Sequence, residues 1–299
     1  MQKIRVSELA RKLQAAGFTV EVIEDAYVAG ICSFSNPRSE CVTFWKYDSV
    51  PSLDMMEGFP GSCTVLIRAE MRAHFEPLHS MLLLVDDPRA AFAVIAEELF
   101  SSNLSPGVHP SASIHEEAII HPSATVGALC VIGQSVVGAR SVIGHGTVIE
   151  NDVLIGQDVV IGALSAIGGS GFGYVETPLG KLIRIPHLGG VRIEDEVHIG
   201  SHVAIDRGTI DDTVLEVGCK IDNLVHIAHN VRVGKRAMVI AGAEVSGGVQ
   251  IGEHSWIAPQ VTIREQIKVG ANAVVGLGAV VVKDVLPGET VFGNPARPR

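Results

Sequence analysis

A six-residue repeat begins near Val108, and this period decides what the second part of the chain can fold into. An aliphatic residue stands at every sixth position, without a break, from Ile221 to Val281. Three shorter series precede this run, with a one-residue slip after the first. They are Val108, Ile114, Ile120, Val126 and Ile132, then Ile143, Ile149, Ile155, Ile161 and Ile167, then Ile193, Ile199 and Ile205. Chance does not produce such a run, so this part of the chain is a solenoid.

A period of six matches neither the 3.6 residues of a helical turn nor simple strand alternation. It fits one flat side of a triangular coil that carries one inward aliphatic residue per side. Glycine often follows that residue, as at Gly133 and Gly234, where a corner would be crowded by a Cβ atom. Small residues such as Ala124 and Ala237 leave room inside. The predicted fold is therefore mainly β, a left-handed parallel β-helix of hexapeptide repeats, with a right-handed solenoid as the alternative.

Two interruptions break the repeat. Residues 168–190, GGSGFGYVETPLGKLIRIPHLGG, are too long and too rich in glycine for a corner, so we expect an excursion loop that leaves the prism. The second interruption lies between Ile205 and Ile221, which are 16 residues apart where three hexads need 18. Irregular places in a regular solenoid are where functional sites are commonly built.

Residues 1–105 lack the hexad and predict a small α/β domain, followed by the β-helix domain at 106–299. We expect helices near 6–16 and after Pro88, and strands near 41–44, 63–67 and 81–85. The two domains have different hydrophobic periods, which indicates that each has its own core.

Composition excludes several classes of function. The net charge of −10 leaves no basic face for nucleic acid or for an anionic membrane surface. No apolar run approaches the length of a membrane span, and the N-terminus does not resemble a secretion signal, so a cytoplasmic protein is expected. The five cysteines are widely spaced without a C-x-x-C pair, which predicts neither a disulfide framework nor a zinc knuckle.

His229 is the candidate catalytic residue. It lies in IDNLVHIAHNV, two positions after the inward Ile227, at an outward corner of the predicted prism. A neutral imidazole at such a corner can accept the proton of an attacking amine, as N-acyl transfer requires. A surface or interface histidine is the alternative interpretation of this residue alone.

Three motifs give His229 its context. The sequence contains GFGY at 171–174, IDRGTIDDT at 205–213 and the DN…IAHNV coil at 222–231. In this order and spacing they closely resemble the UDP-3-O-acylglucosamine N-acyltransferases of lipid A biosynthesis. The resemblance implies a homotrimer with active sites in grooves between prisms and with His229 as general base. It also implies transfer of a 3-hydroxyacyl group from the thioester of acyl carrier protein to the 2-amine of the sugar nucleotide, with no metal and no further cofactor.

The same resemblance implies the substrate-binding residues. They are Phe172, Gly173 and Tyr174 in the excursion, Asp222 and Asn223 beside the base, and His226. The family holds uridine in its first domain through an F-x-x-N-P-x-Y pattern, and the strand here offers Phe44 and Tyr47. Gln266 stands where many members carry a second histidine, and it can donate a hydrogen bond but cannot carry charge.

Alternative functions remain open at this point. The last residues, VVVKDVLPGETVFGNPARPR, resemble the close of coenzyme A-dependent hexapeptide acetyltransferases. The chain would then acylate another nucleotide-linked amino sugar from coenzyme A. A trimeric scaffold without enzymatic activity is a further alternative. A γ-class carbonic anhydrase would use histidines for zinc, but His198, His202, His226 and His229 do not have that family's spacing.

Overall fold

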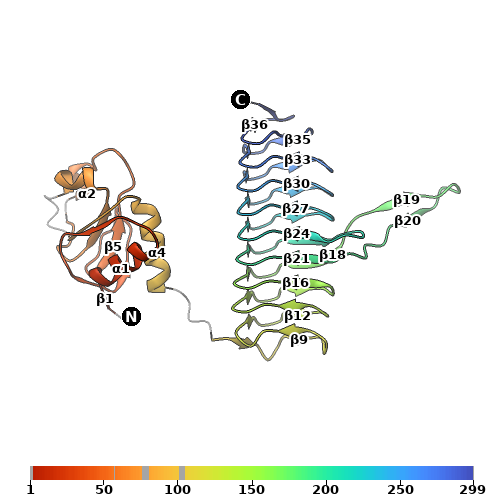
Figure 1. The fold of residues 1–299 in the computed structure, drawn as a ribbon, viewed down its shortest axis with the longest axis horizontal. Coiled ribbons are helices and arrows are strands. Elements are labelled where there is room, and N and C mark those ends of the chain that lie inside the picture. Colours follow the sequence, from red (N-terminus) through yellow and green to blue (C-terminus); the bar gives the residue numbers. More distant parts are fainter. Residues whose placement is uncertain (1–2, 57, 76–80, 101–104, 299) are drawn as a thin grey trace. The chain divides into compact units, whose positions relative to one another are not determined.

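The computed structural model describes residues 3–56, 58–75, 81–100 and 105–298. The chain divides into two compact units, Met1–Asn103 and Leu104–Arg299. Because each unit has its own hydrophobic core, each is described by itself (Figure 1).

The first unit is built on a five-stranded sheet of order β2-β7-β6-β5-β4. Its four neighbouring strands β7, β6, β5 and β4 run parallel, and β2 is antiparallel to β7. The strands are β2 (Val20–Val22), β4 (Gly30–Ile31), β5 (Cys41–Phe44), β6 (Thr64–Ile67) and β7 (Met81–Val85), and a separate pair joins β1 (Ile4–Arg5) to β3 (Tyr27–Val28). The strands expected near 41–44, 63–67 and 81–85 are confirmed.

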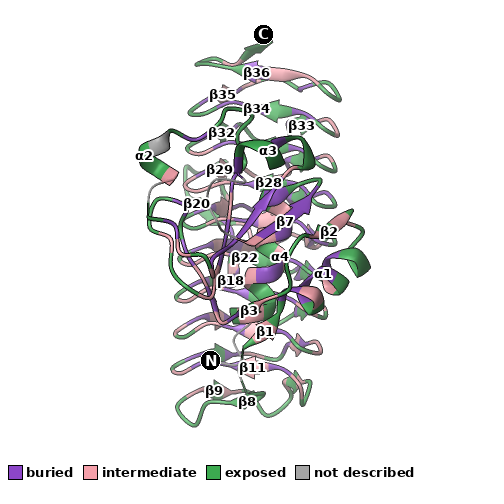
Figure 2. Cartoon of the chain, turned by 90° about the vertical axis from the view of Figure 1, so that its left-hand side faces the viewer, coloured by how far each residue is buried: buried purple, intermediate pink, exposed green. Residues whose placement is uncertain are grey.

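Alternating strand residues divide this unit into two cores. Val42, Leu66 and Leu83 pack on one face against α1 (Val6–Ala15) and α4 (Pro88–Phe100). Val65 and Leu82 pack on the other face together with aromatic residues. This second core also includes residues from the short helices α2 (Leu53–Met56), η1 (Ala69–Met71) and α3 (Arg72–Phe75). Figure 2 shows β7, an interior strand of the sheet, as largely buried. Among the helices of the described residues, none combines the length and apolarity needed to cross a bilayer.

The second unit is a prism of three sheets whose neighbouring strands lie one coil apart (Figure 1). Sheet 1 contains β10 (Ile119–Ile120), β13 (Val136–Val137), β16 (Val153–Ile155), β21 (Val191–Ile193), β24 (Thr213–Leu215), β27 (Arg232–Val233), β30 (Gln250–Ile251) and β33 (Lys268–Val269). Sheet 2 contains β8 (Gly107–Val108), β11 (Thr125–Val126), β14 (Val142–Ile143), β17 (Val160–Ile161), β22 (His198–Ile199), β25 (Lys220–Ile221), β28 (Met238–Val239), β31 (Trp256–Ile257), β34 (Val274–Val275), β36 (Thr290–Phe292) and the antiparallel β37 (Arg297–Pro298). Sheet 3 contains β9 (Ser113–Ile114), β12 (Val131–Ile132), β15 (Val148–Ile149), β18 (Ala166–Ser170), β23 (Ala204–Arg207), β26 (His226–Ile227), β29 (Glu244–Val245), β32 (Thr262–Ile263) and β35 (Val280–Val281).

The hexad residues form the core of the prism, as predicted. Ile227 and Val245 are fully buried on adjacent strands of sheet 3, and Ala124 and Ala237 are buried beside the inward column. The predicted crowding at the corner glycines is confirmed at Gly234, where a Cβ atom would lie 2.7 Å from the backbone nitrogen of Glu253. Stacking of each coil on the next therefore requires glycine at that corner.

The excursion differs from a simple loop. After β18, residues 174–184 form a two-stranded antiparallel hairpin of β19 (Tyr174–Glu176) and β20 (Leu182–Arg184). This hairpin projects from the side of the prism (Figure 1). The chain then returns to begin β21 at Val191.

The second interruption anchors both ends of the excursion. Arg207 is 15% exposed; its Nε donates to the carbonyl of Gly168 at 2.9 Å, its Nη2 donates to the carbonyl of Asn151, and its Nη1 pairs with Asp152. At the other end, Asp212 accepts a hydrogen bond from the backbone N–H of Gly190 at 2.9 Å. These contacts fix where the hairpin leaves and rejoins the prism.

The prediction that this interruption is three hexads with two residues missing is wrong. The inward residue after Ile205 is Leu215 on β24, and Ile221 follows on β25. The segment therefore makes two hexad steps with four additional residues, not three steps with two missing. The extra residues belong to the outward turn at 208–212. The pairing of β18 with β23 just before this turn is irregular at Gly168.

Candidate active site

His229 occupies the corner between β26 and β27, and two glycines make room for its ring. The inward Ile227 is fully buried, while His229 is half-buried. A Cβ atom on Gly247, one coil further on, would lie 2.7 Å from Cε1 and 2.8 Å from Nε2 of His229. A Cβ atom on Gly171, in the excursion, would lie 3.0 Å from Cδ2. The imidazole therefore fits between two backbones that only glycine can provide at these distances.

Asn230 determines which nitrogen of His229 carries the proton. The Oδ1 atom of Asn230 accepts from the backbone N–H of Thr209 at 3.1 Å and from its hydroxyl at 2.9 Å, and Nδ2 donates to the carbonyl of Asp211 at 3.0 Å. Because a backbone N–H only donates and a carbonyl only accepts, this network assigns the orientation of the amide. The His229 Nδ1 atom, 3.1 Å from the same Oδ1, must then be the donor. The lone pair lies on Nε2, beside Gly247, which is the arrangement a general base needs.

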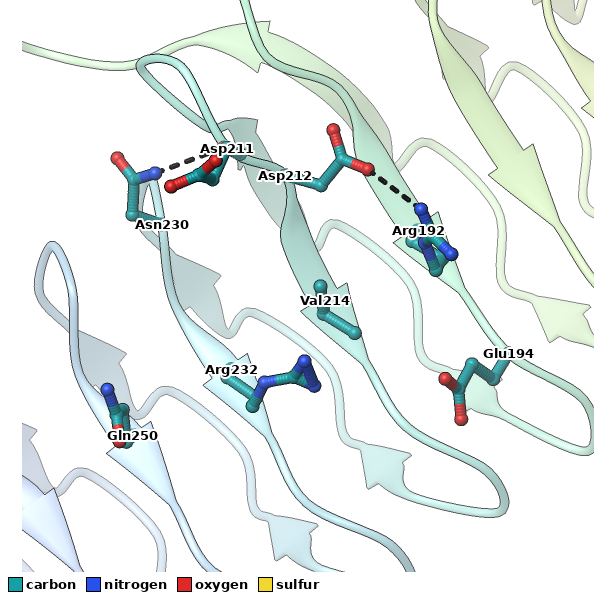
Figure 3. Close-up of a pocket in the computed structure, with 8 residues that line it drawn as sticks. All are labelled: Arg192, Glu194, Asp211, Asp212, Val214, Asn230, Arg232 and Gln250. Carbon is teal, nitrogen blue, oxygen red and sulfur yellow. Dashed lines mark hydrogen bonds and ion pairs between the residues drawn. The ribbon is translucent and has the colours of Figure 1, made fainter.

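A polar groove begins at the same corner. Asn230 lies on its rim, and the outer face of sheet 1 forms its floor (Figure 3). The groove encloses about 540 Å³ and is lined by Arg192, Glu194, Asp211, Asp212, Val214, Asn230, Arg232 and Gln250. Arg192 pairs with Asp212 at 3.4 Å, and Arg232 pairs with Glu216 at 2.7 Å. The hydrogen-bond network that orients the candidate base therefore also borders a cavity.

His187 lies against His229 where the excursion returns to the prism. The two ring centroids are 4.9 Å apart, with an edge-to-face angle of 61°. His187 is only 6% exposed, and its buried Nδ1 has no hydrogen-bond partner among the described residues. Burial, followed by the neighbouring His229, lowers the pKa of His187. His187 is therefore a neutral imidazole at neutral pH.

His226 has a different environment, although it is only three residues from His229. It lies on the outer face of sheet 3, with Nδ1 at 2.8 Å from Glu244 and Nε2 at 3.3 Å from Asp206. The hydrogen bonds to Asp206 and to Glu244 raise the pKa of His226 to about 9. A protonated histidine held by two carboxylates cannot accept a further proton, so of His226 and His229 it is His229 that suits the role of base. Binding of substrate by His226 stays a prediction.

The GFGY residues lie at the start of the excursion. Gly173 lies close to His187, because its Cβ atom would be 3.3 Å from Cε1 of that ring. Phe172 is 87% exposed, and its ring packs against Tyr174 with centroids 5.1 Å apart. The excursion thus reaches the candidate base through Gly171, and Gly173 lies against His187, while the rings of Phe172 and Tyr174 are exposed.

Gln266 lies on the same corner as His229, two coils further on. The backbone N–H of Gly248 donates to the carbonyl of His229, and that of Gln266 donates to the carbonyl of Gly247, both at 2.9 Å. The spacing of about two coils implied for this residue is therefore present. A role in substrate binding stays a prediction.

Asp222 and Asn223 occupy the preceding corner, at the other end of β26. Asp222 accepts from the backbone N–H of Asn223 at 2.7 Å, and Asn223 accepts from that of Ser201 at 2.8 Å. Within a single chain one whole side of the prism separates them from His229, so their implied place beside the base, in a groove between prisms, stays a prediction. A role in substrate binding stays a prediction.

Phe44 and Tyr47 are not brought together in the first unit. Phe44 is half-buried and packs on Phe92 of α4, with centroids 4.7 Å apart. Tyr47 is 53% exposed and lies edge-on to Trp45, which belongs to the core on the other face of the sheet. Neither placement tests uridine binding, which stays a prediction for both residues.

Metal-binding side chains do not gather in the part of the chain that the structure describes. No group of three or more histidine, cysteine, aspartate or glutamate residues there is arranged to hold an ion. The four histidines considered for zinc lie on different strands and corners, with His198 on sheet 2 and His226 on sheet 3.

Several neighbours of His229 were not expected from the sequence. Asn230 is part of the IAHNV motif, and its position directly after the histidine was the available signal. Thr209 and Gly247 come from adjacent coils, and counting hexads places Gly247 one coil after His229. His187 and Gly171 have no such signal, since the excursion has no period.

Comparisons with known proteins confirm the resemblance noted in the motifs. No family model matches the chain. A protein of Caulobacter sp. (strain K31) is 40% identical over 134 residues, which is 45% of this chain and 39% of that protein. A protein of Rhizobium meliloti (strain 1021) is 40% identical over 132 residues, which is 44% of this chain and 37% of that protein. Both are named UDP-3-O-acylglucosamine N-acyltransferase, and the match spans about two fifths of their length.

Solved structures confirm the fold. The UDP-N-acetylglucosamine O-acyltransferase of Moraxella catarrhalis is similar, with a TM-score of 0.59 and 28% identity over 64% of this chain and 73% of that one. The Francisella novicida UDP-N-acetylglucosamine acyltransferase has a TM-score of 0.58 and 25% identity over 64% and 70% of the two chains. The prism is the left-handed parallel β-helix of these hexapeptide-repeat acyltransferases.

Proposed function

From the resemblance to the UDP-3-O-acylglucosamine N-acyltransferases, we propose that this protein is an N-acyltransferase that acylates the 2-amine of UDP-3-O-acylglucosamine. The proposed donor is a 3-hydroxyacyl thioester of acyl carrier protein, the proposed pathway is lipid A biosynthesis, and such a donor places the reaction in the cytoplasm. One observation supports the proposal: at its half-buried corner, Nδ1 of His229 is hydrogen-bonded to Asn230 and Nε2 has no hydrogen-bond partner among the described residues.

The proposed reaction is direct transfer. The amine nitrogen attacks the thioester carbonyl carbon, and Nε2 of His229 takes a proton from the amine as the C–N bond forms. The imidazolium that results is stabilised by its Nδ1–H hydrogen bond to Asn230. The C–S bond then breaks, and the imidazolium returns the proton to the leaving thiolate. The products are an amide and a thiol, and His229 is neutral again.

Gly247 supports this step from the adjacent coil. In the described part of the chain, its N–H makes no backbone hydrogen bond, while its carbonyl accepts from Gln266. The residue lies against the Nε2 edge of His229. We assign the N–H of Gly247 as a donor to the carbonyl oxygen on which negative charge develops.

A trimer is proposed as the working assembly. Large apolar side chains of the excursion are exposed in the single chain, among them Phe172 at 87%, Leu179 at 96%, Leu182 at 65% and Leu188 at 75%. A contiguous group of exposed apolar residues is characteristic of an interface. Packing of the excursion on a neighbouring prism would cover these residues and complete a site at each His229.

The test is transfer of a 3-hydroxyacyl group from acyl carrier protein to UDP-3-O-acylglucosamine by the purified protein. Parallel reactions use His229→Ala, a His254→Gln control and acetyl-coenzyme A as donor. His254 is an exposed corner residue, and glutamine already occupies such corners at Gln260 and Gln266.

We expect transfer by the wild type and the control, with a loss of about a hundredfold or more in His229→Ala. Transfer from acetyl-coenzyme A alone would favour the coenzyme A alternative. No transfer from either donor would favour the scaffold alternative.

A further inference from the structure

The excursion brings a second histidine to the candidate base, and this histidine has no role in the reaction described above. We propose that His187 is a positioning residue, which holds the His229 ring in its catalytic orientation through edge-to-face packing. The expected effect of His187 on the rate rests on the proposed function, whereas its effect on the orientation of the His229 ring does not.

The rings of His187 and His229 fit closely together. Their centroids lie 4.9 Å apart at 61°, which is within the range of a favourable aromatic pair. Gly171 lies in the angle between them, because a Cβ atom there would be 2.7 Å from Nε2 of His187 and 3.0 Å from Cδ2 of His229. Any larger residue at 171 would push the rings apart. The close pair therefore depends on backbone placed there by the excursion.

His187 meets His229 through its ring and not through a hydrogen bond. The side chain is 94% buried, and its Nδ1 has no hydrogen-bond partner among the described residues. The contact between the two histidines is a packing of rings. The excursion therefore brings an aromatic ring, rather than a hydrogen-bonding group, to the face of the base.

Two other sides of the His229 ring are held by neighbouring residues. Asn230 holds Nδ1, and Gly247 lies at the Cε1–Nε2 edge. His187 lies on the remaining Cδ2 side. Because His187 is neutral, it restrains the ring without adding a positive charge that would oppose protonation of the base.

Two substitutions separate ring packing from hydrogen bonding. His187→Phe keeps an aromatic ring and removes both nitrogens, whereas His187→Gln keeps polar atoms and removes the ring. His187→Ala removes both, and His254→Gln is the matched control on an unrelated corner.

Nuclear magnetic resonance of the imidazole nitrogens of His229 provides the first readout, and it needs no substrate. Without the ring packed against it, the His229 imidazole can rotate away from Oδ1 of Asn230, so we expect a mixture of tautomers in His187→Ala and His187→Gln. The Nδ1–H tautomer should persist in the wild type, in His187→Phe and in the control. Melting temperatures measured in parallel identify any variant that is unfolded. A His229 spectrum in folded His187→Ala that equals the wild-type spectrum would overturn the proposal.

Kinetics provides the second readout. We expect kcat to fall about tenfold to hundredfold in His187→Ala and His187→Gln, with KM within about threefold, because a misoriented base slows the chemical step and leaves binding intact. His187→Phe should stay within about threefold of the wild type. An equal loss of kcat in His187→Phe and His187→Ala would contradict positioning by the ring. Failure of the wild type to transfer any acyl group refutes the proposed function and leaves the tautomer result as the test of His187.

Discussion

Replacing Gly247 with alanine should move the candidate base without unfolding the prism. The new Cβ atom would lie 2.7 Å from Cε1 and 2.8 Å from Nε2 of His229, while ordinary contact begins at 3.4 Å. The ring must therefore retreat by about 0.7 Å. The backbone of Gly247 is outside the left-handed region, so alanine can adopt it without strain.

The size of the effect follows from this displacement. A misplacement of about 1 Å can reduce the rate about a hundredfold, so a shift of about 0.7 Å corresponds to a loss of roughly 25-fold in kcat. That loss is equivalent to about 1.9 kcal/mol in the activation free energy. The free energy of unfolding should change by less than about 1 kcal/mol, because the displaced atoms belong to a half-buried corner side chain and not to the backbone or the inward column.

The assay is steady-state acyl transfer together with thermal unfolding of the same preparations. Gly169→Ala is the matched control, since its Cβ atom would meet nothing closer than Asp206 at 3.8 Å, an ordinary contact. A Gly247→Ala enzyme with kcat within about threefold of the wild type would refute the reasoning, as would an equal loss in Gly169→Ala.

Two further predictions concern the surroundings of the site. The pKa of His226 is raised to about 9 in the folded protein, above an unfolded value near 6.5, so its contribution to stability is complete below about pH 6.5 and is lost as the pH rises through about 9. Melting curves should show the difference between the wild type and His226→Gln shrinking over that window, and a difference that is constant with pH would contradict this. Arg207→Ala removes the charged hydrogen bonds to Gly168 and Asn151, so amide hydrogen exchange at the base of the excursion should accelerate about tenfold or more while β29 is unchanged. Unchanged exchange there would show that Arg207 does not anchor the excursion.

The prism is well predicted from the sequence because each six-residue repeat can be recognised by itself. Each hexad carries one inward aliphatic residue, and the positions of Ile227 and Val245 follow from counting alone. The same count places Asn223 and His229 one side apart within a chain, and the structure confirms that separation. Between Ile205 and Ile221 the count is ambiguous, because 16 residues fit either three hexads with two residues missing or two hexads with four residues added.

The residues around His229 are predictable only where they belong to the repeat. Asn230 and Gly247 sit at fixed places relative to the base, so their proximity follows from the coil. His187 returns through a hairpin whose path depends on contacts of Arg207 and Asp212 with distant backbone atoms. No periodic signal encodes such a path, and the contact between the two histidines emerges only in three dimensions.

The stacking of corners along the prism has a consequence for how substitutions combine. The nearest neighbours of a corner residue lie one coil away, so the carbonyl of His229 meets the N–H of Gly248 and the carbonyl of Gly247 meets the N–H of Gln266. Residues about six positions apart, such as Ile221 and Ile227, lie on different sides of the prism, and changes on their outer faces should act more independently. Changes one coil apart share the same contacts and should be strongly epistatic. In this fold, coupling between substitutions is therefore expected at a separation of one full coil along the chain.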